Sequence, residues 1–379
     1  MALSEGEFQA EMAVDDDSFK KNTGLSLREQ YLKYHPQVLS DFGDEIETVW
    51  GKKWKANTNV GKLRMVMVHR PGPEFETIGQ KTPFPPYESH LPAWRMASKI
   101  PLDDMIEDHL NMIDAYKKEG IEVVIRKPET NDPPYQVKAI YTDDVCHAGV
   151  YGQIILRMYD WMRKGEEKYT YQTLAEIGCP VVGMIQGNGM AEGGSIGWLD
   201  EKHLLISVHF PRSNTQTPEV TRANEFGALQ YKQIIQTQDP EVDVRITPGY
   251  GSRMNISHYS LIDRHTTVQD PRNLDPYLKK WMETEMNWEF IDPPEEVCVK
   301  VHTRDPRNPY VKRAPNTGIV LEPRKIMVNE GNSKATKWFE SIGVEVVEID
   351  VATLVRPMNS GSIHCTAGSL IRDAEPKSY

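Results

Sequence analysis

MIEDHLNMIDAYKKEGIEVVI, residues 105–125, sets the pattern of this chain. Its spacing of apolar residues predicts an amphipathic helix over Met105–Glu119, which Gly120 ends, and a strand over Ile121–Ile125. The same order of helix, glycine and strand recurs at Ser333–Ile349, and a weaker copy spans Asn224–Ile246. Strands that alternate with helices indicate an α/β fold, and three similar copies indicate internal repeats.

The chain changes character near residue 60. Residues 1–60 are polar and short of strand signals, with one helix expected over Ser40–Lys55. Leu63–Arg70 then reads as a short apolar strand that is stopped by prolines. We therefore expect an N-terminal helical or irregular extension over 1–60, which packs on the main domain or on a partner subunit. A single α/β catalytic domain is expected over 61–379.

Composition limits the classes of function. The chain has 379 residues, 39% hydrophobic and 26% charged, which is typical of a soluble globular protein. Its net charge of −11 argues against nucleic acid or an anionic membrane as a partner. The beginning of the sequence lacks the charge pattern and apolar core of a signal peptide, and no run of apolar residues is long enough for a membrane span. A cytoplasmic location is expected.

Four scattered cysteines form no CxxC pair, so free thiols are expected and a structural zinc site is not. One of them ends the run of small residues NSGSIHC, residues 359–365. Gly361 and Ser362 would let a substrate approach the backbone beside Cys365, which suits a presented nucleophile. The alternative is a buried structural cysteine. On a strand, His364 and Cys365 would face opposite sides, so His364 is not expected to be the partner base.

Two carboxylates have suitable surroundings for a ligand. Asp144 follows the apolar run Val137–Ile140, which predicts a strand, although aspartate also favours solvated turns. Glu192 is followed by Gly193 and Gly194, which would admit a ligand close to the backbone, although a turn between two strands has the same composition. The glycines lack the spacing of a dinucleotide fingerprint, and no metal-ligand spacing occurs, so no cofactor is expected.

His258 precedes an apolar run that resembles a strand. Histidine is the natural base and proton shuttle for a thiol nucleophile. The chain has 11 histidines, and a structural role is the alternative for any one of them.

These pieces, in this order, resemble the guanidino-group-modifying superfamily, which contains arginine deiminases, dimethylarginine hydrolases and amidinotransferases. The segments that are similar to the family's motifs are Gly61–Gly72, Thr142–Asp144, Glu192–Gly194, Arg212–Asn214 and Lys325–Thr366. The resemblance covers residues 61–373. It implies a fivefold pseudosymmetric α/β propeller of ββαβ repeats around a central site, which would account for the repeats.

The resemblance also implies roles for individual residues. Cys365 would be the nucleophile, and Asp144 and Glu192 would hold a planar N–C–N group over its sulfur. Further substrate-binding positions would be Gly193, Arg212, Asn359 and Gly361. Attack would give a thiouronium-like adduct that water or an amine resolves, without a metal or an organic cofactor.

The family's His-x-Asp is missing from this sequence. In the register set by Tyr259, Met254 and Ile256 stand at its positions, which leaves His258 as the candidate to assist the thiol or the water. Without a general acid an amine leaves poorly, whereas nitrite departs as a stable anion. These departures favour the 2-nitroimidazole nitrohydrolase branch of the superfamily, in which the attacked carbon also lies between two nitrogens.

We therefore expect a Cys-dependent C–N hydrolase, and most narrowly the denitration of 2-nitroimidazole to imidazol-2-one and nitrite. One alternative is an arginine or guanidine deiminase or an amidinotransferase. Another is an inactive propeller that only binds a ligand. The expected partners are a small nitroimidazole-like or guanidine-like substrate and further copies of the chain in a homo-oligomer.

Overall fold

The computed structural model describes residues 24–25, 42–77, 100–209, 222–249, 259–269, 275–302, 310–313, 318–355 and 361–375. The chain divides into two compact units, Met1–Val49 and Trp50–Tyr379. All but the last residue of helix α4, Phe42–Trp50, belongs to the first unit. This helix stops well before Lys55, its expected end, because Gly51 adopts a left-handed φ of 77°.

Five small sheets in the described residues repeat one plan. In each, a middle strand pairs antiparallel with one neighbour and parallel with the other, and a helix precedes the parallel strand. The strands are β1 (Leu63–Val68), β2 (Glu122–Ile125), β3 (Cys146–Ala148), β4 (Gln153–Ile155), β5 (Val181–Met184), β6 (Ile196–Asp200), β7 (His203–His209), β8 (Asp243–Gly249), β9 (Tyr259–Asp263), β10 (Thr266–Gln269), β11 (Glu289–Ile291), β14 (Ile319–Glu322), β15 (Lys325–Asn329), β16 (Glu345–Ile349) and β17 (Gly368–Arg372). The helices are α6 (Leu102–Lys118), α7 (Glu166–Glu176), α8 (Glu225–Gln238), α9 (Pro276–Glu285) and α10 (Ser333–Ser341). The sheet orders are β17-β1-β2, β3-β4-β5, β6-β7-β8, β9-β10-β11 and β14-β15-β16.

The predicted order of helix and strand is confirmed at all three places, with a glycine between the two elements at the first two. After α6, Gly120 has a left-handed φ of 72°, and β2 then runs parallel to β1. Gly343, with a φ of 79°, plays the same part between α10 and β16. The copies α7–β5 and α9–β11 were not predicted from the sequence. The left-handed residue that follows α9 is Asn287, with a φ of 60°, so the glycine signal is absent there.

The first sheet is built from two distant parts of the chain. β17 pairs antiparallel with β1, with Val66 opposite Ser369, while β2 pairs with the other edge of β1. A separate two-stranded antiparallel sheet consists of β12 (Val299–His302) and β13 (Tyr310–Arg313).

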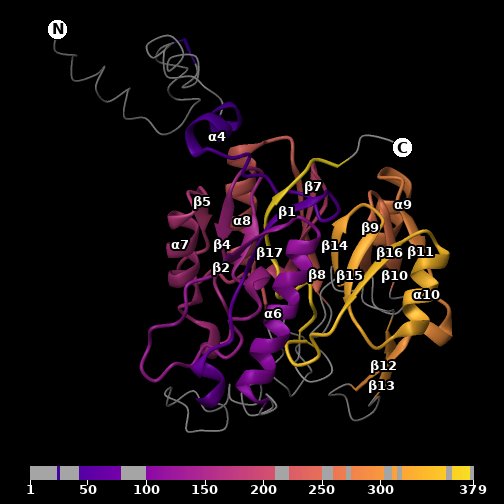
Figure 1. Ribbon diagram of the computed structural model, residues 1–379. Coiled ribbons are helices and arrows are strands. Elements are labelled where there is room, and N and C mark those ends of the chain that lie inside the picture. The colour runs from indigo at the N-terminus through magenta and orange to yellow at the C-terminus, as the bar shows by residue number, and fades with distance from the viewer. Residues whose placement is uncertain are drawn as a thin grey trace, which may run out of the picture. The chain divides into compact units, whose positions relative to one another are not determined.

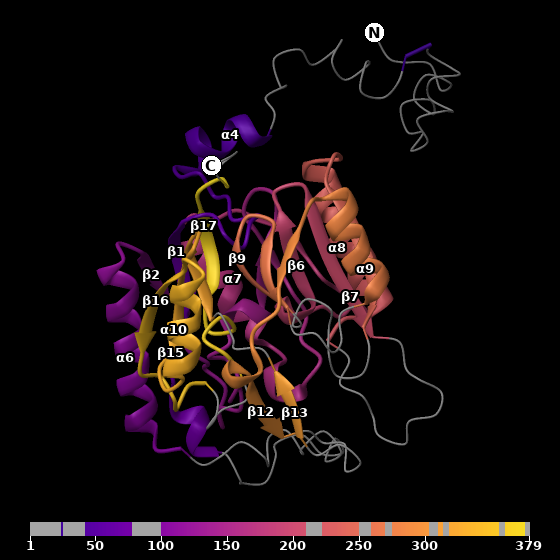
Figure 2. The same ribbon diagram turned by 90° about the vertical axis from the view of Figure 1, so that its right-hand side faces the viewer.

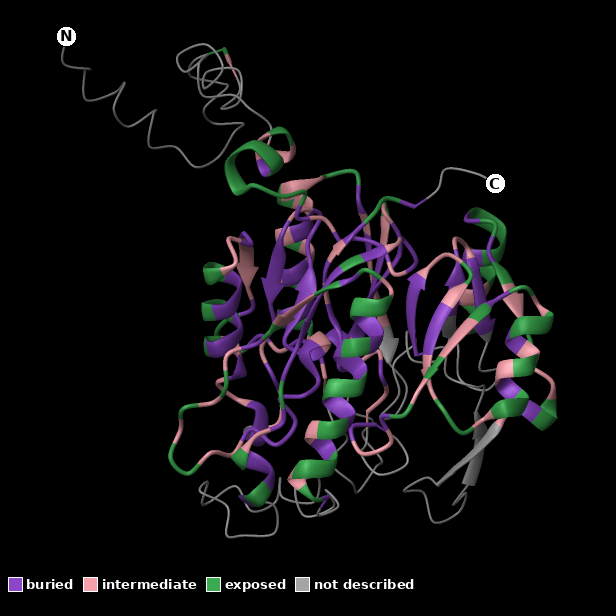
Figure 3. Ribbon diagram, viewed as in Figure 1, coloured by how far each residue is buried: buried purple, intermediate pink, exposed green. Residues whose placement is uncertain are grey.

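The core of the second unit lies between the sheets and the helices outside them. Figures 1 and 2 show α6 to α10 around the periphery, with the strands inside. The helix faces toward the strands are buried and the outer faces are exposed (Figure 3). Three clusters of buried apolar side chains fill the interior; in the first, Met105, Met112 and Tyr116 of α6 pack with Val66 of β1. None of the described helices has the length and hydrophobicity that a membrane span requires.

Candidate active site

Cys365 lies in a turn that ends where β17 begins. The Cys365 N–H donates to the Ser362 carbonyl at 3.0 Å, and the Ala367 N–H donates to the His364 carbonyl at 3.1 Å. These groups bond within the turn and cannot pair with a neighbouring strand. The strand expected for His364 and Cys365 is therefore wrong, and strand alternation does not decide where the two side chains point.

The Cys365 thiol is half-buried among polar groups. Its sulfur lies 3.4 Å from the hydroxyl oxygen of Ser362. Burial raises the pKa of Cys365 and the charge of Asp144 raises it further, while the hydrogen bonds from Ser362 oppose both effects. The thiol is therefore the resting form, since a thiolate is favoured only where a nearby positive charge outweighs these effects.

His364 pairs with the residue next to Asp144. Its Nδ1 lies 3.4 Å from the Asp143 carboxylate. Burial lowers the pKa of His364, but the charge of Asp143 outweighs it and the pKa is raised overall. The Asp143 N–H donates to the Cys365 carbonyl at 3.2 Å, which ties the turn around Cys365 to the segment that carries Asp143 and Asp144.

Asp144 ends the short 3₁₀ helix η3, Thr142–Asp144. The strand predicted over Val137–Ile140 is wrong: this run forms turns, with the Tyr141 N–H bonded to the Lys138 carbonyl at 3.1 Å. Its apolar residues signal burial in the first core cluster rather than a sheet. The Thr142 hydroxyl donates to the Met67 carbonyl at 2.7 Å and accepts from the Gly368 N–H at 3.0 Å. These bonds fix η3 at the junction of β1 and β17.

The Asp144 carboxylate is buried and forms an ion pair with Arg163. Its Oδ2 accepts from Arg163 Nη1 at 2.6 Å, and its Oδ1 accepts from the Gly194 N–H at 3.1 Å. Arg163 also binds both oxygens of Glu166, at 2.9 and 3.0 Å. Burial alone would raise the pKa of Asp144. The charges of Arg163 and Arg222 outweigh burial and hold this pKa below its ordinary value. Asp144 is therefore ionised before any substrate binds.

Glu192 is the second buried carboxylate, and it precedes the 3₁₀ helix η5, Gly193–Ser195. Its Oε1 accepts from the Tyr159 N–H at 2.9 Å. Burial raises the pKa of Glu192 to about 7; Asp144 adds to this and Arg222 opposes it. Glu192 can therefore hold a proton near neutral pH, in contrast to Asp144.

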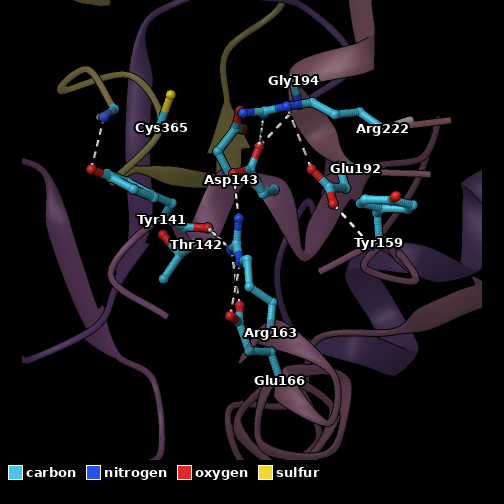
Figure 4. Close-up of polar contacts among 12 residues, drawn as sticks. Tyr141, Thr142, Asp143, Tyr159, Arg163, Glu166, Glu192, Gly194, Arg222 and Cys365 are labelled. Atoms are coloured by element: carbon cyan, nitrogen blue, oxygen red, sulfur yellow. Dashed lines mark hydrogen bonds and ion pairs between the residues drawn. The ribbon is translucent and has the colours of Figure 1, made fainter. Parts of the chain in front are cut away.

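Arg222 contacts both carboxylates and was missed by the sequence analysis. Its Nη1 lies 3.6 Å from Asp144 Oδ1, and its Nε lies 3.7 Å from Glu192 Oε2. Burial lowers the pKa of Arg222, but the charges of Asp144, Glu192 and Cys365 raise it overall. Figure 4 shows Arg222 and Cys365 in the upper part of the site, with Arg163 and Glu166 below.

The loop before α8 holds Arg222 in this place. Asn224 caps α8 through a hydrogen bond from the Gly227 N–H at 2.9 Å. The same side chain accepts from the Met190 N–H at 2.9 Å, two residues before Glu192. An arginine just ahead of a helix cap is the only sequence signal for Arg222. Arg163 and Glu166 gave no signal, since their role depends on contacts with Asp144 from another segment.

Two predicted glycines are close to other parts of the chain. A Cβ on Gly193 would collide with the backbone carbonyl of Asp143. The close approach expected from a ligand at this glycine is therefore made by the protein's own backbone. A Cβ on Gly361 would collide with the ring of Tyr141, whose hydroxyl accepts from the Gly361 N–H at 2.8 Å. The predicted site residues His258, Arg212 and Asn359 lie outside the described residues.

No protein-family model matches the chain. A segment of 93 residues is 32% identical to arginine deiminase of Oenococcus oeni. The match covers 23% of this chain and 20% of the deiminase. The chain thus spans about a fifth of the length of that curated relative.

Solved structures match over most of the chain. An amidinotransferase of the saxitoxin pathway from Microseira wollei is 14% identical, with a TM-score of 0.58 over 86% of this chain and 100% of that one. A dimethylarginine dimethylaminohydrolase from Pseudomonas aeruginosa, a mutant complexed with citrulline, is 14% identical, with a TM-score of 0.56 over 81% of this chain and 99% of that one. At such identities the likeness shows the fold: a mixed α/β fold similar to that of these guanidino-modifying enzymes.

Proposed function

We propose that this chain is a Cys-dependent enzyme that acts on a planar carbon between two nitrogens. Cys365 would attack, and the buried carboxylates Asp144 and Glu192 would orient the nitrogens of the substrate. The proposal is supported by the fold, by the short deiminase match and by the placement of these three residues around one site. We also propose that the five ββαβ units are arranged around a fivefold pseudosymmetric axis. Residues 1–60 would form a contact between copies of the chain.

The substrate in this proposal is an uncharged ring, 2-nitroimidazole. The observation that carries this choice is the charge on Asp144, which Arg163 at 2.6 Å and Arg222 at 3.6 Å already compensate. A cationic guanidinium would have to compete with both arginines for that carboxylate. A neutral ring that donates one N–H to a carboxylate meets no such competition.

The reaction balances without a cofactor. The Cys365 thiol loses its proton, and the sulfur forms a bond to C2 of the ring. The C2–nitro bond then breaks, and nitrite leaves with the bonding electron pair. Water adds to C2, the C–S bond breaks, and imidazol-2-one and the free thiol are formed. The net reaction consumes one water and releases one proton with the nitrite.

The test is nitrite release from 2-nitroimidazole, followed with mass spectrometry of the intact protein. The wild type should release nitrite and imidazol-2-one in equal amounts, and a mass increase should map to Cys365. The variant Cys365→Ala should do neither. Cys298→Ala is the matched control, because Cys298 is a half-buried cysteine like Cys365. Nitrite release that survives Cys365→Ala would rule out the proposed nucleophile.

Guanidine chemistry is the second candidate, and the likeness to a deiminase segment and to an amidinotransferase favours it. Arginine would then give citrulline and ammonia, or ornithine if an acceptor amine takes the amidino group. Incubation with arginine, with and without an acceptor amine, separates this candidate from denitration. An inactive ligand-binding protein would produce nothing from any of these substrates.

A further inference from the structure

Arg222 differs from Arg163 in how firmly it is held. Arg163 is buried and makes bonds of 2.6 to 3.0 Å to Asp144, Glu166 and the Tyr141 carbonyl. The Arg222 side chain is 38% exposed, and its two ion pairs, at 3.6 and 3.7 Å, exceed hydrogen-bond length. Among the described residues, Arg222 therefore has two ion-pair partners, but none of them lies close enough to accept a hydrogen bond from its N–H groups.

The backbone leaves space for this guanidinium. A Cβ on Gly194 would lie 2.8 Å from Arg222 Nη1 and 3.4 Å from Asp144 Oδ1. Gly194 therefore lets the guanidinium cover the carboxylates from the exposed side. Figure 4 shows Arg222 and Cys365 in the same upper part of the site, and the charge of Cys365 contributes to the raised pKa of Arg222. A charged, partly exposed donor group thus lies in the same part of the site as the sulfur.

We propose that Arg222 binds the nitro group of the substrate and stabilises the nitrite that departs from it, which makes Arg222 a catalytic residue of the denitration. This inference rests on the proposed function. A nitro group carries two oxygens in one plane, as a carboxylate does, and a guanidinium presents two parallel N–H groups to such a pair. Its oxygens gain negative charge when sulfur adds to C2 and become those of nitrite when the C–N bond breaks.

Arg163 cannot perform this role. Its Nε and both of its terminal nitrogens already donate to acceptors inside the protein, and its side chain is 5% exposed. Arg222 has spare donors, and its charge is preorganised beside two carboxylates that hold it near the site. A donor aimed at charge that develops in the transition state raises kcat more than it lowers KM.

The test compares two leaving groups in Arg222→Gln. With 2-nitroimidazole, kcat should fall by about 100-fold to 1,000-fold, as for the loss of an oxyanion donor. With 2-bromoimidazole, whose bromide lacks the pair of oxygens, the fall should be at least tenfold smaller. Arg222→Lys keeps the charge without the planar fork and should lie between the wild type and Arg222→Gln. An equal fall for both substrates would mean that Arg222 only holds Asp144 and Glu192, which overturns the inference.

A second measurement does not depend on turnover. Sodium nitrite should slow the alkylation of Cys365 by iodoacetamide in the wild type and not in Arg222→Gln. Arg245→Gln, which removes an arginine stacked on Trp281 at 3.5 Å, is the matched control and should behave as the wild type. If the wild type releases no nitrite from 2-nitroimidazole, the proposed function fails. If it does and Arg222→Gln releases nitrite at the same rate, only the role of Arg222 fails.

Discussion

The guanidinium of Arg163 lies 2.6 Å from the carboxylate of Asp144, and both side chains are almost completely buried. On its other side the same guanidinium binds Glu166 through two hydrogen bonds. One buried cation therefore lies between two buried anions, and it holds Asp144 in position together with Arg222.

Removing the Arg163 guanidinium should destabilise the folded protein. Arg163→Met leaves Asp144 and Glu166 as buried anions, so the free energy of unfolding should drop by about 3–5 kcal/mol. Urea denaturation measures this change. Lys202→Met is the control, since its ion pairs with Asp239 and Glu241 are exposed and should contribute less than about 1 kcal/mol. Equal losses for the two variants would contradict the buried network.

Gly193→Ala should lower both stability and activity. Its added methyl group would collide with the Asp143 carbonyl, which is backbone and cannot rotate away. We expect a loss of about 3 kcal/mol in the free energy of unfolding, at the upper end for overpacking, and a displaced Asp144. Gly187→Ala is the comparison: it strains a left-handed φ of 60° but has open space, so about 1 kcal/mol is expected. Similar values would argue against the contact.

Ser362→Ala should make Cys365 less reactive. The hydrogen bond from the Ser362 hydroxyl lowers the pKa of the thiol, against burial and Asp144, so its loss raises the pKa, while the backbone bond from residue 362 remains. One pKa unit changes the thiolate fraction about tenfold, so alkylation near neutral pH should slow several-fold. Peptide mass spectrometry measures the rate for Cys365, with Cys298 as the internal reference. Ser341→Ala, at an exposed helix end, should change nothing.

Stability should depend on pH through Asp200. This carboxylate accepts from His203 at 2.8 Å and from His265 at 2.9 Å. Burial raises the pKa of Asp200, but the two hydrogen bonds outweigh it and lower the pKa; the bond to Asp200 raises the pKa of His203. The Asp200 contribution is therefore present above about pH 4 and lost as pH falls below it. The His203 contribution is present below about pH 6.5 and lost as pH rises above it.

Urea denaturation across this range should thus show a stability advantage of the wild type over Asp200→Asn that peaks between about pH 4 and 6.5. Asp373→Asn, at a surface ion pair with Arg64, should shift the curve little. A wild-type advantage that does not vary with pH would contradict the linkage.

Features that depend on neighbouring residues in the chain could be predicted from the sequence. Gly120 and Gly343 end helices by the same left-handed conformation, and each is followed by a parallel strand, so the repeat could be found from spacing alone. Val137–Ile140 was misjudged because an apolar run signals burial, which a turn in the core satisfies as well as a strand. Cys365 and Glu192 could be selected because small or glycine residues lie beside them, and Asp144 because it follows an apolar run.

The cations of the site could not be predicted. Arg163 lies 19 residues after Asp144, and Arg222 lies 30 residues after Glu192, and neither carries a motif. Their roles arise only when η3, η5 and the loop before α8 meet. The charge balance of the site, which bears most directly on the choice of substrate, is therefore a property of the tertiary structure.

The pairing of β17 with β1 has a consequence for the order of folding. Cys365 lies three residues before β17, and β17 pairs with a strand that begins at Leu63. Contacts between such distant segments carry a large loop-closure entropy and form late. The turn around Cys365 is therefore fixed only after the two ends of this unit have met, and a partly folded chain carries an ordinary exposed thiol there. We therefore expect Cys365 to meet Asp144 in one of the last steps of folding.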